Sequence, residues 1–324
     1  MLTVEEAQSL VKKEIEKLEF PEKPGNLYDP VRYILSNGGK RIRPSLVLLG
    51  ANVFSDDVTG ALWPAVGIEI FHNFTLLHDD LMDNSEIRRG RPTVHLKWNA
   101  NISILSGDVM SILSYNYISR VQEEYLKYVL SVFNRTALEV CEGQMMDMDF
   151  ENRNDVSLDE YLRMIELKTS VLIAASLEIG ALSVGGQRSA AKDLYDFGLN
   201  LGIAFQLQDD LLDSFGNQDT FGKKVGNDIL TNKKTYLMIS LQNLSEPADY
   251  GILEKLLSTA NIDPQEKISG VLSLFEKYNI RQITQEKINE FFSRATAKLD
   301  RIDLPENRKK VLRDFSLELM GRKM

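Results

Sequence analysis

Apolar residues recur at the spacing of one helix face along most of the chain. The N-terminal segment shows this clearly, with apolar residues three or four positions apart at Val4, Ala7, Val11, Ile15 and Leu18. Glycine, proline or polar clusters interrupt the pattern, which resumes after each interruption. No segment shows the strict alternation of apolar and polar residues that a half-buried strand requires. The sequence therefore predicts an all-α protein.

The interruptions divide the chain into about ten or more helices. They fall at 21–25, 38–39, 123–127, 151–158 and 185–186, and near 247, 264 and 302–305. Ser157, with Glu160 three residues later, predicts the start of a helix. No repeat array or low-complexity linker separates one part of the chain from another. We therefore expect residues 1–324 to form a single domain, a bundle of helices.

Two aspartate clusters share one pattern: two adjacent aspartates and a third three residues later, at the end of an apolar run and before a basic, glycine-containing loop. The two sets are Asp79, Asp80 and Asp83, and Asp209, Asp210 and Asp213. Carboxylates near the C-terminal end of a helix are destabilised by the negative end of the helix dipole, so a bound cation would offset that cost. Mg2+ shared with a phosphate-bearing substrate suits such oxygen ligands. The repeated pattern predicts a paired metal–carboxylate site.

Positive charge gathers in a few segments, although the chain carries a net charge of −9. The first is SNGGKRIRP at 36–44, where paired glycines allow close backbone approach to an anion; an ordinary basic turn is the alternative. A second follows the first aspartate cluster, and a third lies at 216–235. Lys168 interrupts an apolar segment, where an unpaired charge is costly to bury, so we expect it to face a cavity that contains an anion.

Composition excludes several classes of protein. A single cysteine, Cys141, rules out an intramolecular disulfide framework and fits a reducing, cytoplasmic location. The N-terminal segment lacks the apolar core of a signal peptide, and no stretch is long and apolar enough to predict a membrane span. The acidic net charge argues against a nucleic-acid partner. No Ser-His-Asp or Cys-His pairing and no GxxxxGK[ST] phosphate loop is evident, which argues against a kinase or NTPase.

The chain resembles the trans-isoprenyl diphosphate synthases, the short-chain polyprenyl synthetase family. The resemblance extends over nearly the whole chain and rests on GGKRIRP, DDLMDNSEIRRGRPTVH, GQMMD, LKT, FQLQDDLLD and GKK…NDI…NKK, in that order. It implies a helical bundle around a deep central cavity, a homodimer, and Mg2+-dependent head-to-tail condensation of isopentenyl diphosphate with an allylic diphosphate. The steps would be ionisation, condensation and elimination, giving a short-chain trans-prenyl diphosphate.

The resemblance also implies roles for individual residues. Asp79, Asp83 and Asp209 would ligate Mg2+ directly, and Asp80, Asp210 and Asp213 would act directly or through water. The allylic diphosphate would rest on three Mg2+ ions together with Arg88, Lys168, Lys223 and Lys233. Isopentenyl diphosphate would contact Lys40, Arg43, His72 and Arg89. The carbonyl of Lys168, with Thr169 and Gln206, would stabilise the allylic cation, and the departing pyrophosphate would take the proton.

Product length is expected to depend on Phe74 and Thr75. At about 1.5 Å per residue they lie roughly 6–7.5 Å deeper along the helix than Asp79. In the family, bulky side chains at this depth form the floor against which the growing chain stops. One aromatic residue beside a threonine is typical of archaeal-type geranylgeranyl synthases, so we expect a C20 rather than a C15 product. Alternatively, Phe74 packs into the core and a residue on a neighbouring helix sets the floor.

Three other functions fit the sequence less well. A class I terpene cyclase shares the first aspartate motif, but this chain carries a second DDxxD and the GGKRIRP segment for a second diphosphate. A non-catalytic regulatory subunit of a prenyl synthase typically lacks aspartates from one or both clusters, whereas all six are present here. A di-iron helical bundle needs two Glu-x-x-His pairs, and this sequence has one, Glu69–His72.

Overall fold

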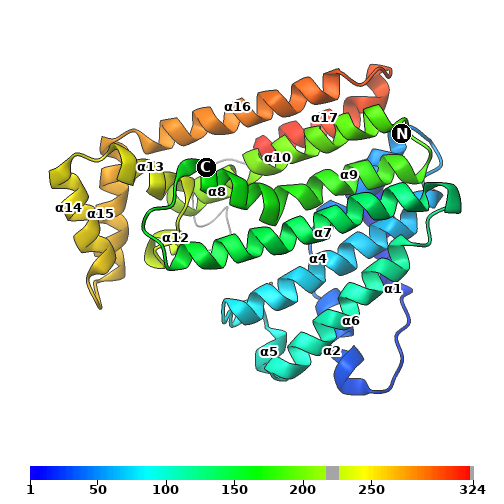
Figure 1. Ribbon diagram of the computed structural model, residues 1–324, viewed down its shortest axis with the longest axis horizontal. Coiled ribbons are helices and arrows are strands. Elements are labelled where there is room, and N and C mark those ends of the chain that lie inside the picture. Colours follow the sequence, from blue (N-terminus) through cyan, green and yellow to red (C-terminus); the bar gives the residue numbers. More distant parts are fainter. Residues whose placement is uncertain (217–225, 322–324) are drawn as a thin grey trace. The chain divides into compact units, whose positions relative to one another are not determined.

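The computed structural model describes residues 1–216 and 226–321 (Figure 1). Helices form most of this part of the chain, and its two strands, β1 (Ile87–Arg88) and β2 (Arg91–Pro92), pair in a short antiparallel hairpin. The all-helical fold predicted from the sequence is confirmed. None of the helices in the described part is long and apolar enough to cross a membrane.

The chain forms two compact units. Unit 1 contains residues 1–135, 175–195 and 302–312, and unit 2 contains 136–174, 196–301 and 313–324. The single-domain organisation expected from the sequence stays a prediction. Four helices contribute residues to both units: α7 (Glu123–Glu151), α9 (Val171–Ser183), α10 (Arg188–Phe215) and α17 (Glu306–Met320).

Unit 1 is organised around α4, which is buried along most of its length. Besides the hairpin and parts of α7, α9, α10 and α17, the elements of unit 1 are α1 (Val4–Glu16), α2 (Gly25–Leu35), α3 (Ile42–Asn52), η1 (Thr59–Ala61), α4 (Leu62–Met82), α5 (Val94–Lys97) and α6 (Ala100–Ile118). Helices α4 and α6 lie side by side because Gly67 leaves room for Ile118, and Gly107 leaves room for His78 (Figure 1). This packing supports the end of α4, where the first aspartate cluster lies.

Small residues on α9 allow close helix packing. A Cβ on Gly180 would collide with the backbone of Val47 on α3, and a Cβ on Gly50 would collide with the backbone of Leu177. The helix ends before Gly185, whose φ of 78° favours glycine. The start of α3, which carries the GGKRIRP motif, is thereby held firmly in unit 1.

Unit 2 has a core formed by α8, α10, α13, α15 and α16. Besides parts of α7, α9, α10 and α17, the described elements of unit 2 are α8 (Leu158–Ile165), the π-helical turn η2 (Glu166–Ser170), α12 (Asn227–Leu230), α13 (Tyr236–Leu244), α14 (Pro247–Ser258), α15 (Pro264–Lys277) and α16 (Ile280–Asp300). The Ser157–Glu160 capping box predicted from the sequence begins α8. The π-helical turn was not predicted, and it carries Lys168 and Thr169.

Candidate active site

The first aspartate cluster is divided between buried and accessible carboxylates. Asp80 is buried, and the Arg88 Nε donates to its two carboxylate oxygens at 2.7 and 2.8 Å. The side chain of Asp79 is 20% exposed, and Asp83, the last residue of the helical turn, is exposed. Asp79 and Asp83 therefore remain accessible to a metal ion, whereas the charge of Asp80 is already neutralised.

Arg88 stays charged in this setting. Burial disfavours its cationic form, but its hydrogen bond to Asp80 and the attraction of the Asp80, Asp79 and Asp83 carboxylates outweigh that effect and raise its pKa. Arg88 lies in β1, and the hairpin turn that follows uses positive φ angles at Arg89 and Gly90. The turn thus holds Arg88 against the end of α4.

The GGKRIRP segment is held by a buried ion pair. Arg41 begins α3 with a left-handed φ of 48°, and its guanidinium bonds to Glu69 and to the carbonyl oxygen of Leu35. Glu69 is 1% exposed and also accepts a hydrogen bond of 2.7 Å from Asn73 Nδ2. The pair fixes the loop relative to α4, which carries His72.

Arg43, His72 and Arg89 come together beside this ion pair. Arg43 Nη1 lies 3.3 Å from His72 Nε2. Burial, together with the nearby arginines, holds the pKa of His72 well below its usual value, so the imidazole is neutral and can accept from Arg43. Burial lowers the pKa of Arg43 to about 10, so this guanidinium is still charged at neutral pH.

The backbone conformation at position 39 requires glycine. Its φ of 119° is strained for any other residue, and a Cβ there would lie 2.8 Å from the Arg89 guanidinium carbon. Arg89 also donates to the carbonyl oxygen of Gly38. Lys40 is exposed in the same loop. The structure thus brings Arg43, His72 and Arg89 together, with Lys40 exposed in the adjoining loop, and this arrangement suits an anion.

The second cluster has two buried aspartates, Asp210 and Asp213, and one that is partly exposed, Asp209. Asp210 is buried and accepts from the Tyr161 hydroxyl and, at 3.1 Å, from Gln206 Nε2. Burial, with repulsion from Asp228, raises the pKa of Asp210 to about 7, and Lys233 and the two hydrogen bonds oppose the rise. Asp209 is partly exposed. Asp209 is therefore the more accessible of this adjacent pair.

Asp213 holds the start of α12. Its Oδ2 accepts from the backbone amide of Asp228 at 3.0 Å, and its carbonyl oxygen accepts from the amide of Gly226. Lys233, which follows α12, is exposed, and its amide donates to the carbonyl oxygen of Asp228 at 2.9 Å. Lys223, predicted to bind the allylic diphosphate, lies outside the described residues.

Lys168 has a carboxylate partner in unit 2. Its Nζ donates to Asp147 Oδ2 on α7 at 2.5 Å. The two meet because Gly143 lets the η2 turn approach α7, where any Cβ would collide with the amide of Lys168. Next to Lys168, Thr169 Oγ1 donates to Gln206 Oε1 at 3.3 Å. Lys168, Thr169 and Gln206 are thus brought into one polar group.

Phe74 and Thr75 lie on α4. Phe74 is half-buried, with its ring edge-on to His78 at 4.8 Å between centroids and tilted against Phe71 at 5.5 Å. Thr75 Oγ1 donates to the carbonyl oxygen of His72 at 2.8 Å. The role of these two residues in product length stays a prediction.

Sequence reasoning missed Tyr161, Asp147 and the Arg41–Glu69 pair as parts of these groups. Asp147 could have been recognised in the sequence, because it stands three residues after Gln144 in an otherwise apolar stripe and has no basic residue beside it. Tyr161 gave no such signal. Its partner, Asp210, is 49 residues away in the sequence.

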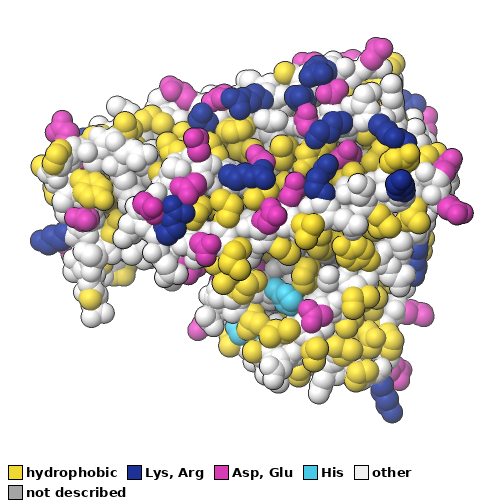
Figure 2. Space-filling model, viewed as in Figure 1, with side chains coloured by type: hydrophobic (Ala, Val, Ile, Leu, Met, Phe, Trp, Pro, Cys, Tyr) yellow, Lys and Arg dark blue, Asp and Glu magenta, His cyan; other side chains and the backbone are white. Residues whose placement is uncertain are grey.

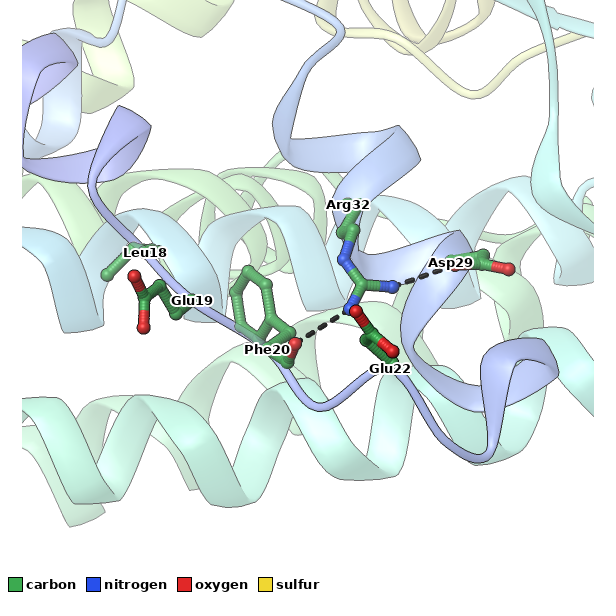
Figure 3. Close-up of a pocket in the computed structure, with 6 residues that line it drawn as sticks. All are labelled: Leu18, Glu19, Phe20, Glu22, Asp29 and Arg32. Carbon is green, nitrogen blue, oxygen red and sulfur yellow. Dashed lines mark hydrogen bonds and ion pairs between the residues drawn. The ribbon is translucent and has the colours of Figure 1, made fainter.

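A surface pocket of about 480 Å³ lies apart from these residues in unit 1, between the segment after α1 and α2 (Figure 3). Arg32 occupies one wall, where it pairs with Asp29 and donates to the carbonyl oxygens of Phe20 and Pro21. None of the predicted site residues lines this pocket.

Comparisons with known proteins show which proteins the chain is similar to. The family model described as polyprenyl synthetase matches residues 24–274. A geranylgeranyl diphosphate synthase of Methanosarcina mazei is 41% identical over 228 residues, which cover 70% of each chain. A crystal structure of a geranylgeranyl pyrophosphate synthase superposes with a TM-score of 0.94 at 43% identity over 100% of both chains. A geranylgeranyl pyrophosphate synthetase from Pyrococcus horikoshii Ot3 gives 0.91 at 33% identity, covering 99% of this chain and 97% of that one.

Proposed function

The chain belongs to the polyprenyl synthetase family, and we propose that it is a geranylgeranyl diphosphate synthase. In this reaction isopentenyl diphosphate condenses head to tail with an allylic diphosphate, and the product is a C20 trans-prenyl diphosphate. The grouping of Arg43, His72 and Arg89 beside Lys40 carries the proposal, because a second diphosphate needs an anion site of its own. The names of the relatives favour C20.

We propose Asp79, Asp83 and Asp209 as ligands of three Mg2+ ions that also bind the allylic diphosphate. The donors are carboxylate oxygens, which Mg2+ prefers. Within the described ranges, no three Asp, Glu, His or Cys side chains form a preformed metal cage. This fits Mg2+, which binds through one or two carboxylates together with substrate phosphate oxygens. When bound, the ions neutralise the charge of the departing diphosphate.

Cationic side chains would assist the departure of the diphosphate. Lys168 and Lys233, with Arg88, would hold its oxygens, and Lys223 is proposed for the same role. As the allylic carbon–oxygen bond breaks, negative charge grows on the diphosphate, so positive groups fixed around it lower the barrier. Arg88 additionally pairs with Asp80 and lies 3.7 Å from Asp79, so it would support the first cluster beside the proposed metal ligands.

The carbocation would be stabilised by oxygen dipoles of unit 2. Gln206 directs its amide nitrogen to Asp210 and its oxygen to Thr169, so the amide has one preferred orientation. The negative end of this dipole and the Thr169 oxygen would face the cation. The double bond of isopentenyl diphosphate then attacks the allylic carbon, a carbon–carbon bond forms, and the released pyrophosphate accepts the proton that is lost.

We further propose a homodimer in the cytoplasm. Helix α6 exposes four large hydrophobic side chains, Ile104, Leu105, Ile112 and Tyr115 (Figure 2). At about 100° per residue these four positions fall on one side of the helix. An exposed apolar stripe of this kind is typical of a subunit interface. Cys141 is exposed and free, which suits a reducing compartment.

Product analysis tests the proposed function. The purified protein would be incubated with Mg2+, isopentenyl diphosphate and, separately, the C5, C10 and C15 allylic diphosphates, and the products identified by mass spectrometry. We expect a C20 diphosphate from at least one primer. Absence of any elongated product with all three primers would contradict the proposal and favour a regulatory subunit.

A further inference from the structure

Lys267 is a buried lysine with an unusual set of partners. It is 5% exposed and lies in the first turn of α15. Its Nζ donates to the carbonyl oxygen of Leu230 at 3.0 Å and to Asn232 Oδ1 at 2.7 Å. No carboxylate of the described residues forms an ion pair with it. The ammonium group is therefore held by two neutral oxygens that belong to one short segment.

This position is unfavourable for a lysine in two respects. Burial disfavours the charged form and lowers the pKa of Lys267. The first turn of a helix is also the positive end of its dipole, which repels a cation. A methionine or leucine would fill the same space without either cost. The local packing of α15 therefore gives no reason for a lysine, and the reason has to lie in the segment that it binds.

That segment leads directly to two proposed site residues. Lys233 follows Asn232, and the Lys233 amide donates to the carbonyl oxygen of Asp228. The Asp228 amide in turn donates to Asp213 Oδ2 at 3.0 Å. Hydrogen bonds, joined by the short segment 230–233, thus connect α15 through α12 to the second aspartate cluster.

The backbone of the segment also needs an anchor. Asn232 adopts a left-handed φ of 56°, which is uncommon outside glycine. Its side chain is held at both ends: Oδ1 accepts from Lys267, and Nδ2 donates to the carbonyl oxygen of Leu257 at 3.2 Å. Gly226, at the other end of α12, packs against Ile268, the residue after Lys267. Helix α15 therefore fixes both ends of α12.

We propose that Lys267 is a positioning residue for the allylic diphosphate site: by anchoring residues 230–232 it presets the direction of Lys233 and the orientation of Asp213. The proposal rests on the proposed function, in which Lys233 binds the allylic diphosphate. The positive charge of Lys233 already acts on Asp210, so its ammonium lies within electrostatic range of the second cluster. An exposed lysine on an anchored backbone loses less conformational freedom when it binds an anion, so the affinity is higher.

Steady-state kinetics of Lys267→Met test this role. We expect the KM for the allylic diphosphate to rise roughly 2- to 10-fold, the effect of ordering one long side chain on binding, with the KM for isopentenyl diphosphate changed less than about twofold. Lys277→Met is the matched control, because it removes a lysine from the same helix whose side chain is 56% exposed and paired with Asp249. We expect neither KM to change in the control.

Asn232→Gly tests the same contact from the other side. Glycine accepts a φ of 56° without strain, so the fold should be retained while the oxygen that binds Lys267 is lost. We expect the same selective rise in the allylic KM, and a double variant with Lys267→Met that is less than additive, because both changes remove one contact. Lys233→Met is the reference variant, because it removes the side chain that Lys267 is proposed to position.

Amide hydrogen exchange gives a readout that does not depend on turnover. In Lys267→Met, the amides of Asp228 and Lys233 should exchange faster, with α16 unchanged. Equal rises in both KM values, additive effects in the double variant, or unchanged exchange at 226–235 would overturn the proposal. These outcomes are distinct from failure of the proposed function, in which the wild-type protein forms no product while the exchange result still reports on the anchor.

Discussion

Arg88 donates from Nε to both carboxylate oxygens of Asp80, at 2.7 and 2.8 Å. Because of this bond, the charge of Asp80 is neutralised, whereas its neighbours in the cluster, Asp79 and Asp83, stay accessible. In unit 2, Tyr161 and Gln206 occupy the oxygens of Asp210, and Asp213 is also buried, so Asp209 is the accessible member of that cluster. We therefore propose the more accessible aspartates, Asp79, Asp83 and Asp209, as the metal ligands.

Removing an accessible aspartate should abolish most of the activity. We expect Asp79→Ala or Asp209→Ala to lower kcat by about 100-fold or more, because charge on the departing diphosphate is no longer compensated. Asp159→Ala, at an exposed position of α8, is the control and should retain near-normal turnover. Near-normal kcat in either cluster variant would exclude that residue as a metal ligand.

Magnesium binding should require a diphosphate. Mg2+ is usually bound through one or two carboxylates together with substrate phosphate oxygens, so the proposed aspartate ligands alone would hold it weakly. Calorimetric titration should therefore show Mg2+ binding about 10-fold or more tighter with pyrophosphate present, or about 1.4 kcal/mol. Equal affinity without pyrophosphate would indicate a preformed site. Addition of EDTA should stop turnover completely.

The anion site of unit 1 should affect one substrate selectively. Arg43→Ala or Lys40→Ala should raise the KM for isopentenyl diphosphate by roughly 10- to 150-fold, the effect of losing one charged hydrogen bond of about 1.5–3 kcal/mol. The KM for the allylic diphosphate should change little. Arg32→Ala, which alters the separate surface pocket, is a suitable control. A similar rise in both KM values for Arg43→Ala would contradict the assignment.

His72 should make the protein less stable in mild acid. Its pKa is lowered in the folded protein, by burial first and then by the nearby arginines. Below about pH 6.5 the unfolded chain therefore binds a proton that the folded protein does not, and the free energy of unfolding falls as pH falls. One proton contributes at most about 1.4 kcal/mol per pH unit.

Denaturant unfolding at pH 7.5 and pH 5.5 measures this effect. His72→Gln should show a smaller loss of stability between these two pH values than the wild-type protein. An equal loss in both would mean that other groups cause the pH dependence.

Product length should respond to the two residues below Asp79. Phe74→Ala should lengthen the product by at least one isoprene unit, because the half-buried ring is replaced by open space. Thr75→Phe should shorten it towards C15. The measurement is chromatography of the dephosphorylated products. If neither variant shifts the distribution, a residue on a neighbouring helix forms the floor.

The sequence by itself determined the helices, the aspartate clusters and the basic segments. These features depend on residues close together in the chain: helical periodicity repeats every three or four residues, and the Ser157–Glu160 capping box needs only four. The motifs, taken in order, also sufficed to identify the family. Short-range chemistry of this kind is visible without a fold.

Only the tertiary structure decided which member of each group is buried and what it touches. Asp79 and Asp80 look alike in the sequence, and the difference arises because a turn with positive φ angles returns Arg88 to Asp80. Lys168 was expected to meet an anion in a cavity, and its protein partner, Asp147, reaches it only because Gly143 lets two helical segments approach. Lys267 looks like an ordinary surface lysine, since it stands among polar residues at the start of a helix. Its role depends on oxygens more than 30 residues away in the chain, and contacts over such distances follow from packing, which local sequence patterns do not encode.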